Sequence, residues 1–147
     1  MSSRDQARGP QPPIEPIPDR DSAPYWEALR QGELRLQRCE ECAALRWPAR
    51  AICNRCRSFD CEWEAVSPHG RILSWTRTEQ VFAPSLRESV PYYTVQVALD
   101  AQSDILMIGG WLSSRTPRAG ELVEMEPVRP DPKSATRLPF WKPIAED

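Results

Sequence analysis

The sequence has few of the residues on which active sites usually depend, and it has no long apolar run. Histidine occurs once, as His69 in a Ser-Pro-His-Gly segment. A phosphate-binding loop, a nucleophile elbow and a zinc-protease helix motif are all missing from the sequence. No stretch of about 18 apolar residues occurs, so we expect no membrane-spanning helix. The sequence thus offers no obvious catalyst, and we interpret His69 as a solvated residue of a turn over residues 67–70.

Positive charge and targeting signals are also scarce. The net charge is −2, from 19 basic and 21 acidic residues, and only two of the basic residues are lysines. This balance argues against a protein that binds nucleic acids mainly by electrostatic attraction. The first residues, MSSRDQARGPQPP, lack the apolar stretch of a secretory signal. We therefore expect a cytoplasmic protein with reduced cysteines.

Four of the five cysteines form two C-x-x-C pairs, Cys39 with Cys42 and Cys53 with Cys56, with ten residues between the pairs. Each C-x-x-C turn can direct two sulfurs at one ion, and two such turns complete the tetrahedral shell that Zn²⁺ prefers. A shell of four cysteines leaves no open position for water or substrate, so the metal is expected to be structural.

Two alternatives to zinc remain open from the sequence. Iron in the same shell would make a rubredoxin-like electron carrier, because tetrahedral sulfur sites hold either metal. Disulfides fit poorly with an odd number of cysteines and no secretory signal. The fifth cysteine, Cys61, lies outside both pairs, and we interpret it as a small, partly buried residue.

The first 32 residues divide into a tail and a short helix. Residues 1–20 contain five prolines and almost no large apolar side chains, which predicts a disordered tail. Residues 21–32 (DSAPYWEALRQG) predict a helix capped by Asp21 or Ser22 and ended by Gly32. Tyr25, Trp26 and Leu29 form an apolar stripe on this helix. The stripe either packs on its own domain or docks on another subunit.

The rest of the chain is predicted to be β-structure in two parts. A zinc ribbon is expected over residues 33–66, with strands at 33–38, 44–47 and 62–66. Residues 67–143 contain four β-rich stretches, at 71–78, 92–99, 105–112 and 122–128, and an edge-like fifth at 137–141 that contains Pro139. Five short strands without a helical pattern predict a small barrel, for which the OB fold is one model. The pair Gly109-Gly110 would let the third strand bend sharply.

Several of these segments are similar to one known family. The run P-Y-W-E-A-L-R-Q-G-E-L-R-L-Q-R-C-E-E-C (24–42), W-P-A-R-A-I-C-N-R-C (47–56) and G-R-I-L-S-W-T (70–76) resembles the zinc-ribbon and OB-fold acyl-CoA-associated proteins, long catalogued as a domain of unknown function. The segment P-R-A-G-E-L-V (117–123) also resembles that family's loop into a late barrel strand. This chain departs from the family pattern at Ala43, where glycine is usual, and at Asn54, where proline is common.

The resemblance implies a mainly β protein with a short N-terminal helix, a rubredoxin-like zinc ribbon and a C-terminal five-stranded OB-fold barrel. It implies that Cys39, Cys42, Cys53 and Cys56 hold structural zinc. It also implies a non-catalytic subunit that associates with a thiolase, a thiolase-like aldolase or acyltransferase, or a hydratase-type enzyme, and that helps to hold acyl-CoA. A single-stranded nucleic-acid-binding protein and a rubredoxin-type redox carrier are the alternatives.

A coenzyme A site has to be argued from charge, because no family motif for it is matched here. Guanidinium groups match phosphate oxygens, and Arg46 and Arg50 flank Trp47 in the ribbon. Arg46 and Arg50 are therefore the candidate contacts for the phosphates of coenzyme A. Arg46 and Trp47 are neighbours on a strand and face opposite sides, so one continuous site would need other residues as well.

Overall fold

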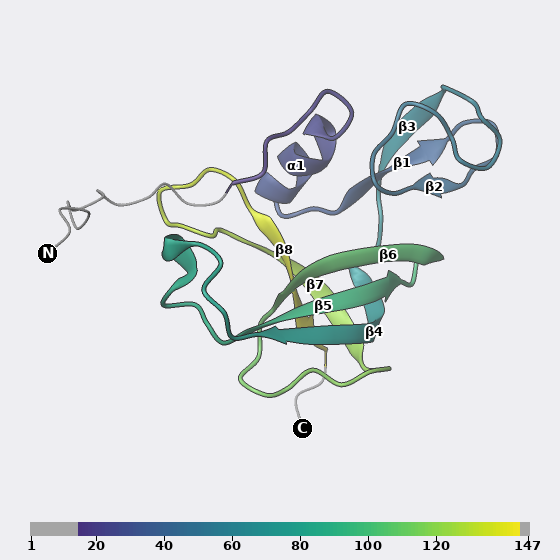
Figure 1. Cartoon of the computed structure of the whole chain (residues 1–147). Helices are drawn as coiled ribbons and strands as arrows, with labels where there is room; N and C mark the ends of the chain where they lie inside the picture. Colours follow the sequence, from purple (N-terminus) through teal and green to yellow (C-terminus); the bar gives the residue numbers. More distant parts are fainter. Residues whose placement is uncertain (1–14, 145–147) are drawn as a thin grey trace, which may run out of the picture.

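The computed structural model describes residues 15–144, which form a helix, a small sheet and a barrel (Figure 1). The predicted tail over residues 1–20 lies largely outside the described residues. The helix, the three-stranded sheet β2-β1-β3 and the closed barrel β4-β5-β6-β8-β7 follow one another along the chain. Their bounds are α1 (Ala23–Arg30), β1 (Arg35–Cys39), β2 (Leu45–Arg46), β3 (Cys61–Ala65), β4 (His69–Thr78), β5 (Tyr92–Leu99), β6 (Gln102–Trp111), β7 (Leu122–Val128) and β8 (Leu138–Pro143), with a short 3-10 turn η1 (Pro84–Leu86).

Local capping sets the ends of α1. Ser22 occupies the N-cap, but its hydroxyl does not cap the helix. The hydroxyl instead accepts from the N–H of Asp19 (3.1 Å), while the Asp19 carboxylate accepts from the N–H of Ser22 (2.7 Å). Gly32, with φ +84°, provides the left-handed backbone that follows the last turn. The helix predicted over residues 21–32 is confirmed in this shorter form. Neither the length nor the apolarity needed to cross a membrane is reached by any helix within residues 15–144.

The apolar stripe of α1 packs inside its own chain. Tyr25 and Leu29 are 2% and 0% exposed. The Tyr25 ring packs 4.9 Å from Trp26 and 4.8 Å from Trp47, between ring centroids. Tyr25 and Leu29 are therefore not available to another subunit, and that part of the docking prediction is wrong, because their burial completes this chain's own core. Trp26 is half-buried and stays a prediction as a partner contact.

The five barrel strands are confirmed, in an order that fits the OB fold. Residues facing the interior alternate along each strand, and Val95, Val97, Met107 and Trp141 are all fully buried. A short parallel pairing of β6 with β8 closes the barrel, with Trp111 opposite Trp141. The last strand, β8, was predicted to be edge-like. That prediction is wrong, because β8 pairs with both β6 and β7.

Two details of the sequence-based predictions change in the structure. Residues 67–70 do not form a complete turn, because β4 already starts at His69, whose exposed side chain lies 3.6 Å from Glu124 across the β4–β7 pair. Gly109 and Gly110 allow β8 to approach β6 closely. A Cβ on Gly109 would lie 2.4 Å from the Pro139 carbonyl oxygen. For these glycines the structure shows a close approach of the two strands, and the sharp bend predicted in β6 stays a prediction.

One glutamine joins the ribbon to the barrel. Gln102, at the start of β6, accepts from the N–H of Leu45 through Oε1 (2.8 Å) and donates from Nε2 to the Leu45 carbonyl (3.1 Å). Leu45 is buried, and buried backbone groups need hydrogen-bond partners. The Gln102 amide provides one partner for the N–H and one for the carbonyl of Leu45. An exposed ion pair of Arg55 with Asp104, at 2.6 Å, lies at the same junction.

We expect Gln102→Ala to lower the free energy of unfolding by about 2–3 kcal/mol, because it leaves two buried peptide groups of Leu45 without partners. Asp104→Ala is the matched control, and it should cost less than about 1 kcal/mol because its ion pair is solvated. Urea denaturation of the two metal-loaded variants measures both values. Equal effects of the two substitutions would show that Gln102 does not hold the junction.

Candidate functional site

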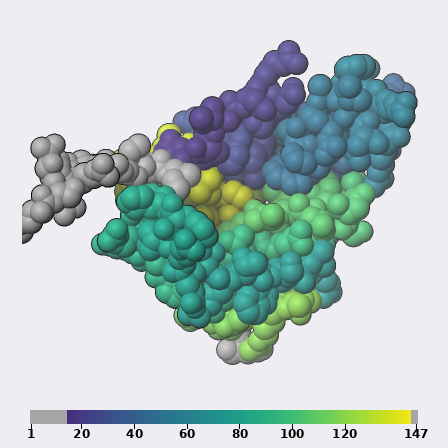
Figure 2. Space-filling model, viewed as in Figure 1, coloured from purple at the N-terminus to yellow at the C-terminus, as the bar shows by residue number. Residues whose placement is uncertain are grey.

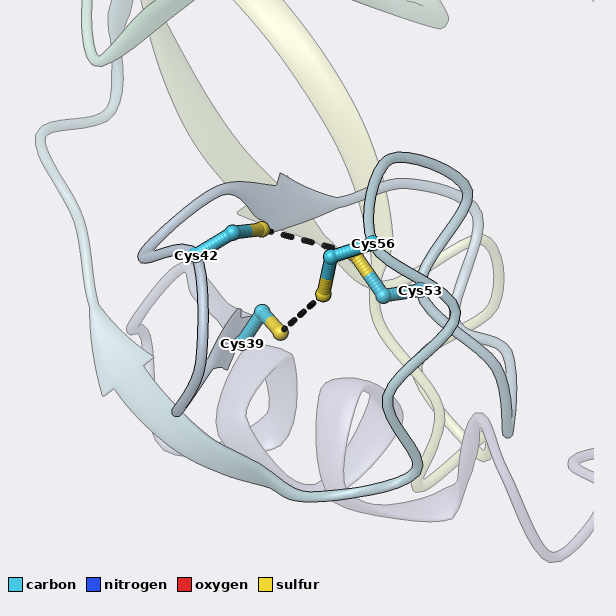
Figure 3. Close-up of side chains that lie close together, drawn as sticks. All are labelled: Cys39, Cys42, Cys53 and Cys56. Atoms are coloured by element: carbon cyan, nitrogen blue, oxygen red, sulfur yellow. Dashed lines mark hydrogen bonds between the residues drawn. The ribbon is translucent and has the colours of Figure 1, made fainter.

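The four paired cysteines converge on one point of the ribbon (Figure 3). Cys39 is the last residue of β1, Cys42 follows in the turn before β2, and Cys53 and Cys56 lie in the loop between β2 and β3. Their sulfurs all lie within 4.8 Å of one another, with Cys39 to Cys56 at 3.5 Å and Cys42 to Cys53 at 3.6 Å. A tetrahedron with metal–sulfur bonds of about 2.3 Å has sulfur–sulfur edges of about 3.8 Å. The four residues therefore fit a metal ion.

The two cysteine turns have the same backbone design. In the first, the N–H of Ala43 donates to the Cys39 carbonyl (3.0 Å), and in the second the N–H of Arg57 donates to the Cys53 carbonyl (3.0 Å). The residue after each second cysteine has a left-handed backbone, with φ 60° at Ala43 and 64° at Arg57. Glycine adopts this conformation most easily, which gives a physical reason for the glycine that the family resemblance leads us to expect at position 43. Both positions hold residues for which it is strained.

Replacing Ala43 or Arg57 by glycine should raise the free energy of unfolding by about 0.5–1 kcal/mol each. The left-handed backbone costs a residue with a Cβ about 1–2 kcal/mol, and glycine removes this cost. Glycine also makes the unfolded chain more flexible, which offsets part of the stabilisation. Thermal unfolding of the metal-loaded variants measures the change. Gly replacing the half-exposed Ala65, whose strand backbone needs no positive φ, is the matched control and should destabilise.

Backbone N–H groups and neighbouring sulfurs shift the pKa values of the cysteines in opposite directions. The N–H of Cys42 is the main cause that lowers the pKa of Cys39 to about 6, and Arg46 lowers it further. The N–H groups of Cys56 and Arg55 likewise lower the pKa of Cys53. At Cys56 the N–H of Ser58 lowers the pKa, but the other sulfurs, Cys39 first, raise it to about 12. Four thiolates this close thus need a cation among them to be ionised together.

Cys61 lies beside this site but does not belong to the group of four. It pairs directly with Cys39 in the β1–β3 register and is half-buried. This placement agrees with the interpretation of Cys61 as a small, partly buried residue. The alternation of β3 brings its side chain to the same face as that of Cys39.

The structure brings Arg46 and Arg50 close to the ribbon backbone, and it buries Arg46. Arg46 is 1% exposed, and its guanidinium donates to four backbone carbonyls. Arg46 is therefore not available to a phosphate, and that prediction is wrong. Arg50 is half-buried and donates to the carbonyls of Pro48 (3.2 Å) and Trp47 (2.7 Å). As a phosphate contact, Arg50 stays a prediction.

A cleft of about 600 Å³ opens on the barrel, and no feature of the sequence predicted it. It lies where the start of β5, the end of β6 and the start of β8 meet the loop after η1. In Figure 2 the yellow C-terminal part of the chain lies between the teal loop before β5 and the purple segment that contains α1. Aromatic and aliphatic side chains line most of the cleft, and serine and tyrosine hydroxyls provide its polar groups. Its lining includes Leu86, Ser89, Tyr92, Trp111, Leu138 and Phe140, and none of the lining residues within 15–144 is charged.

The comparisons with known proteins agree on the ribbon. Residues 26–62 match the model of the ChsH2 rubredoxin-like zinc ribbon domain. Over 84 residues, 57% of this chain, the sequence is 32% identical to a probable enoyl-CoA hydratase alpha subunit of Thermomonospora curvata. The matched part is only 26% of the length of that relative.

Solved structures extend the similarity to the whole fold. A chain of the Ltp2–ChsH2(DUF35) aldolase superposes with a TM-score of 0.78 at 26% identity, covering 89% of this chain and 100% of that one. A DUF35-family protein of unknown function from Sulfolobus solfataricus superposes with a TM-score of 0.58 at 12% identity, covering 84% and 85% of the two chains, which shows a shared fold alone. Together, the ribbon match and the aldolase chain support the predicted resemblance: this chain is similar to the zinc-ribbon proteins of the DUF35 family, with a ribbon like that of the ChsH2, rubredoxin-like domain.

Proposed function

We propose that this protein is a non-catalytic, metal-stabilised subunit that associates with a thiolase-fold enzyme of acyl-CoA metabolism in the cytoplasm. One observation carries the proposal: this chain matches the full length of the DUF35 chain in the Ltp2–ChsH2 aldolase. The relative described as a hydratase subunit points to the same area of metabolism, and it makes a hydratase-type enzyme the second candidate partner.

The chemistry of the ribbon supports a structural role for this chain. A closed shell of four thiolates leaves no ligand position at which a metal could activate water or substrate. Bound zinc would supply folding energy to residues 39–56 and no chemistry to a substrate. The reacting groups are therefore assigned to the partner enzyme.

Zinc is the metal we propose, with iron as the alternative for the same shell. Elemental analysis of protein purified without added metal separates the two, and so does colour, because ferric thiolate absorbs visible light and zinc does not. One equivalent of zinc is the expected result. A red protein with one equivalent of iron would favour the redox carrier.

The barrel cleft is where we propose that acyl-CoA touches this chain. Its volume lies within the usual range for small-molecule sites. Because the described residues that line it carry no charge, it suits the uncharged pantetheine arm or the acyl chain better than the phosphates. The same lack of charge speaks against single-stranded nucleic acid, which needs a basic groove. Binding of an acyl-pantetheine without phosphates, followed by calorimetry, tests this assignment, and Leu138→Asp should abolish it.

Co-expression tests the main proposal. The full chain is produced with a thiolase-fold enzyme encoded beside it and, separately, with a neighbouring hydratase-type enzyme. Size-exclusion chromatography with light scattering should show a stable complex with the thiolase-fold enzyme, and that enzyme should gain activity toward an acyl-CoA substrate. Association with the hydratase alone would move the proposal to the second partner. Association with neither enzyme, in a protein that carries its metal, would overturn it.

A further inference from the structure

Arg46 is a buried cation without a carboxylate partner. It is 1% exposed, and none of the ion pairs found within residues 15–144 involves it. Its neighbours on the ribbon differ, since Arg38 pairs with Glu64 and Arg55 with Asp104. An arginine stays protonated in proteins, and a buried charge is costly unless something compensates it.

Backbone carbonyls accept from both terminal nitrogens of this guanidinium, but they do not neutralise its charge. Nη1 donates to the carbonyls of Arg50 (3.4 Å) and Ala51 (3.3 Å), where the chain enters the second cysteine turn. Nη2 donates to those of Ser58 (3.1 Å) and Asp60 (3.1 Å), where the chain leaves it. Nε is buried and has no hydrogen-bond partner in the described part of the chain. Carbonyls are neutral dipoles, so a full positive charge remains.

The negative groups that face this charge are sulfurs. The Ser58 carbonyl that accepts from Arg46 also accepts from the N–H of Cys53 (2.9 Å), which places the guanidinium beside the second turn. Burial lowers the pKa of Arg46, but the sulfurs of Cys39, Cys61 and Cys53 raise it above its ordinary value. Four thiolates around a divalent ion leave a net charge of about −2, and around a trivalent ion about −1. Two of the four cysteines are buried and two exposed, and in such a partly buried site a neighbouring cation stabilises the more negative centre more strongly.

We propose that Arg46 is the charge partner of the metal–tetrathiolate centre and that it favours a divalent ion over a trivalent one in this shell. The same side chain fastens both ends of the second cysteine turn, so it couples the retention of the metal to the closure of the ribbon. This inference rests on the metal binding proposed above but not on the enzyme partner. It also gives a reason why the ribbon is poorly suited to stabilise ferric iron.

Two variants separate charge from hydrogen bonding. Arg46→Gln removes the charge and keeps an N–H₂ donor, whereas Arg46→Lys keeps the charge and loses the planar fork. Zinc release from the full chain to the chromogenic chelator 4-(2-pyridylazo)resorcinol should be at least tenfold faster for Arg46→Gln than for wild type, with Arg46→Lys close to wild type. Arg35→Met, which removes a half-exposed arginine of the neighbouring strand β1, is the control and should leave the rate unchanged.

The reduction potential of the iron-loaded protein provides a readout that a purely structural role would not move. Wild type and Arg46→Lys should have similar potentials, and Arg46→Gln a lower one, because the ferrous centre loses its nearby cation. Equal zinc release by the lysine and glutamine variants, or an unchanged potential in Arg46→Gln, overturns the proposal. If Arg46→Gln does not fold, a potential of Arg46→Lys well below that of wild type overturns it. A wild-type protein that binds no metal would instead refute the metal site itself.

Discussion

Cys39→Ser should purify with far less than one equivalent of metal and with an unfolded ribbon. Cys39 is buried at the end of β1, and its sulfur lies 3.5 Å from that of Cys56, so its loss leaves three sulfurs in the shell. Structural zinc contributes on the order of 10 kcal/mol to folding in small modules. The ribbon has only three short strands, one of them of two residues, so little else would keep it folded.

Elemental analysis and hydrogen exchange measure this result. Amides of β1 and β3 should lose protection in Cys39→Ser, and the same loss should follow when a chelator strips wild type. Cys61→Ser is the matched control, because Cys61 lies opposite Cys39 in the sheet but outside the metal shell. A Cys39→Ser variant that keeps a full equivalent of metal and a protected ribbon would contradict the site described here.

Gly109→Ala should lower the free energy of unfolding by about 3 kcal/mol or more. A Cβ on Gly109 would lie 2.4 Å from the carbonyl oxygen of Pro139 and 2.8 Å from the ring of Trp141. The first contact is with backbone and the second with a fully buried side chain, so neither can move away cheaply. Urea denaturation of the metal-loaded protein measures the loss.

Gly110→Ala provides the comparison, because its clash has a different cause. A Cβ there would lie 2.2 Å from Cε1 of Phe140, whose side chain lines the cleft. The double variant Gly110→Ala/Phe140→Ala should lose less stability than the two single variants lose together, because the shortened side chain removes the clash. Phe140→Ala should not rescue Gly109→Ala in this way. Rescue of both glycine variants, or of neither, would show that the approach of β8 to β6 is not what limits these positions.

The metal site could be predicted from the sequence because its geometry is local. All four ligands lie within residues 39–56, and each C-x-x-C turn orients its two sulfurs through its own backbone N–H groups. The departure at Ala43 was also visible, and the structure adds its reason, a left-handed backbone. The same strain at Arg57 carried no signal, because arginine is ordinary in a loop.

The residues whose roles were predicted wrongly all make contacts between distant segments of the chain. Tyr25 and Leu29 form a stripe that fits either a partner or the chain's own core, and only the position of the ribbon and barrel decides between these. Arg46 looked like a free cation because its acceptors, from Arg50 to Asp60, come into place only when the second turn folds back over it. The order of residues along the chain does not contain that information.

Residue spacing alone thus determined the metal ligands, the β-rich character and the number of barrel strands, since turns and alternation act over a few residues. The tertiary structure decided which faces are covered, where the uncharged cleft opens and which cation is buried beside the thiolates. These features depend on packing between segments far apart in the sequence, such as β6 with β8 or Leu45 with Gln102. Burial and charge compensation are properties of the folded surroundings and not of a residue's neighbours in the chain.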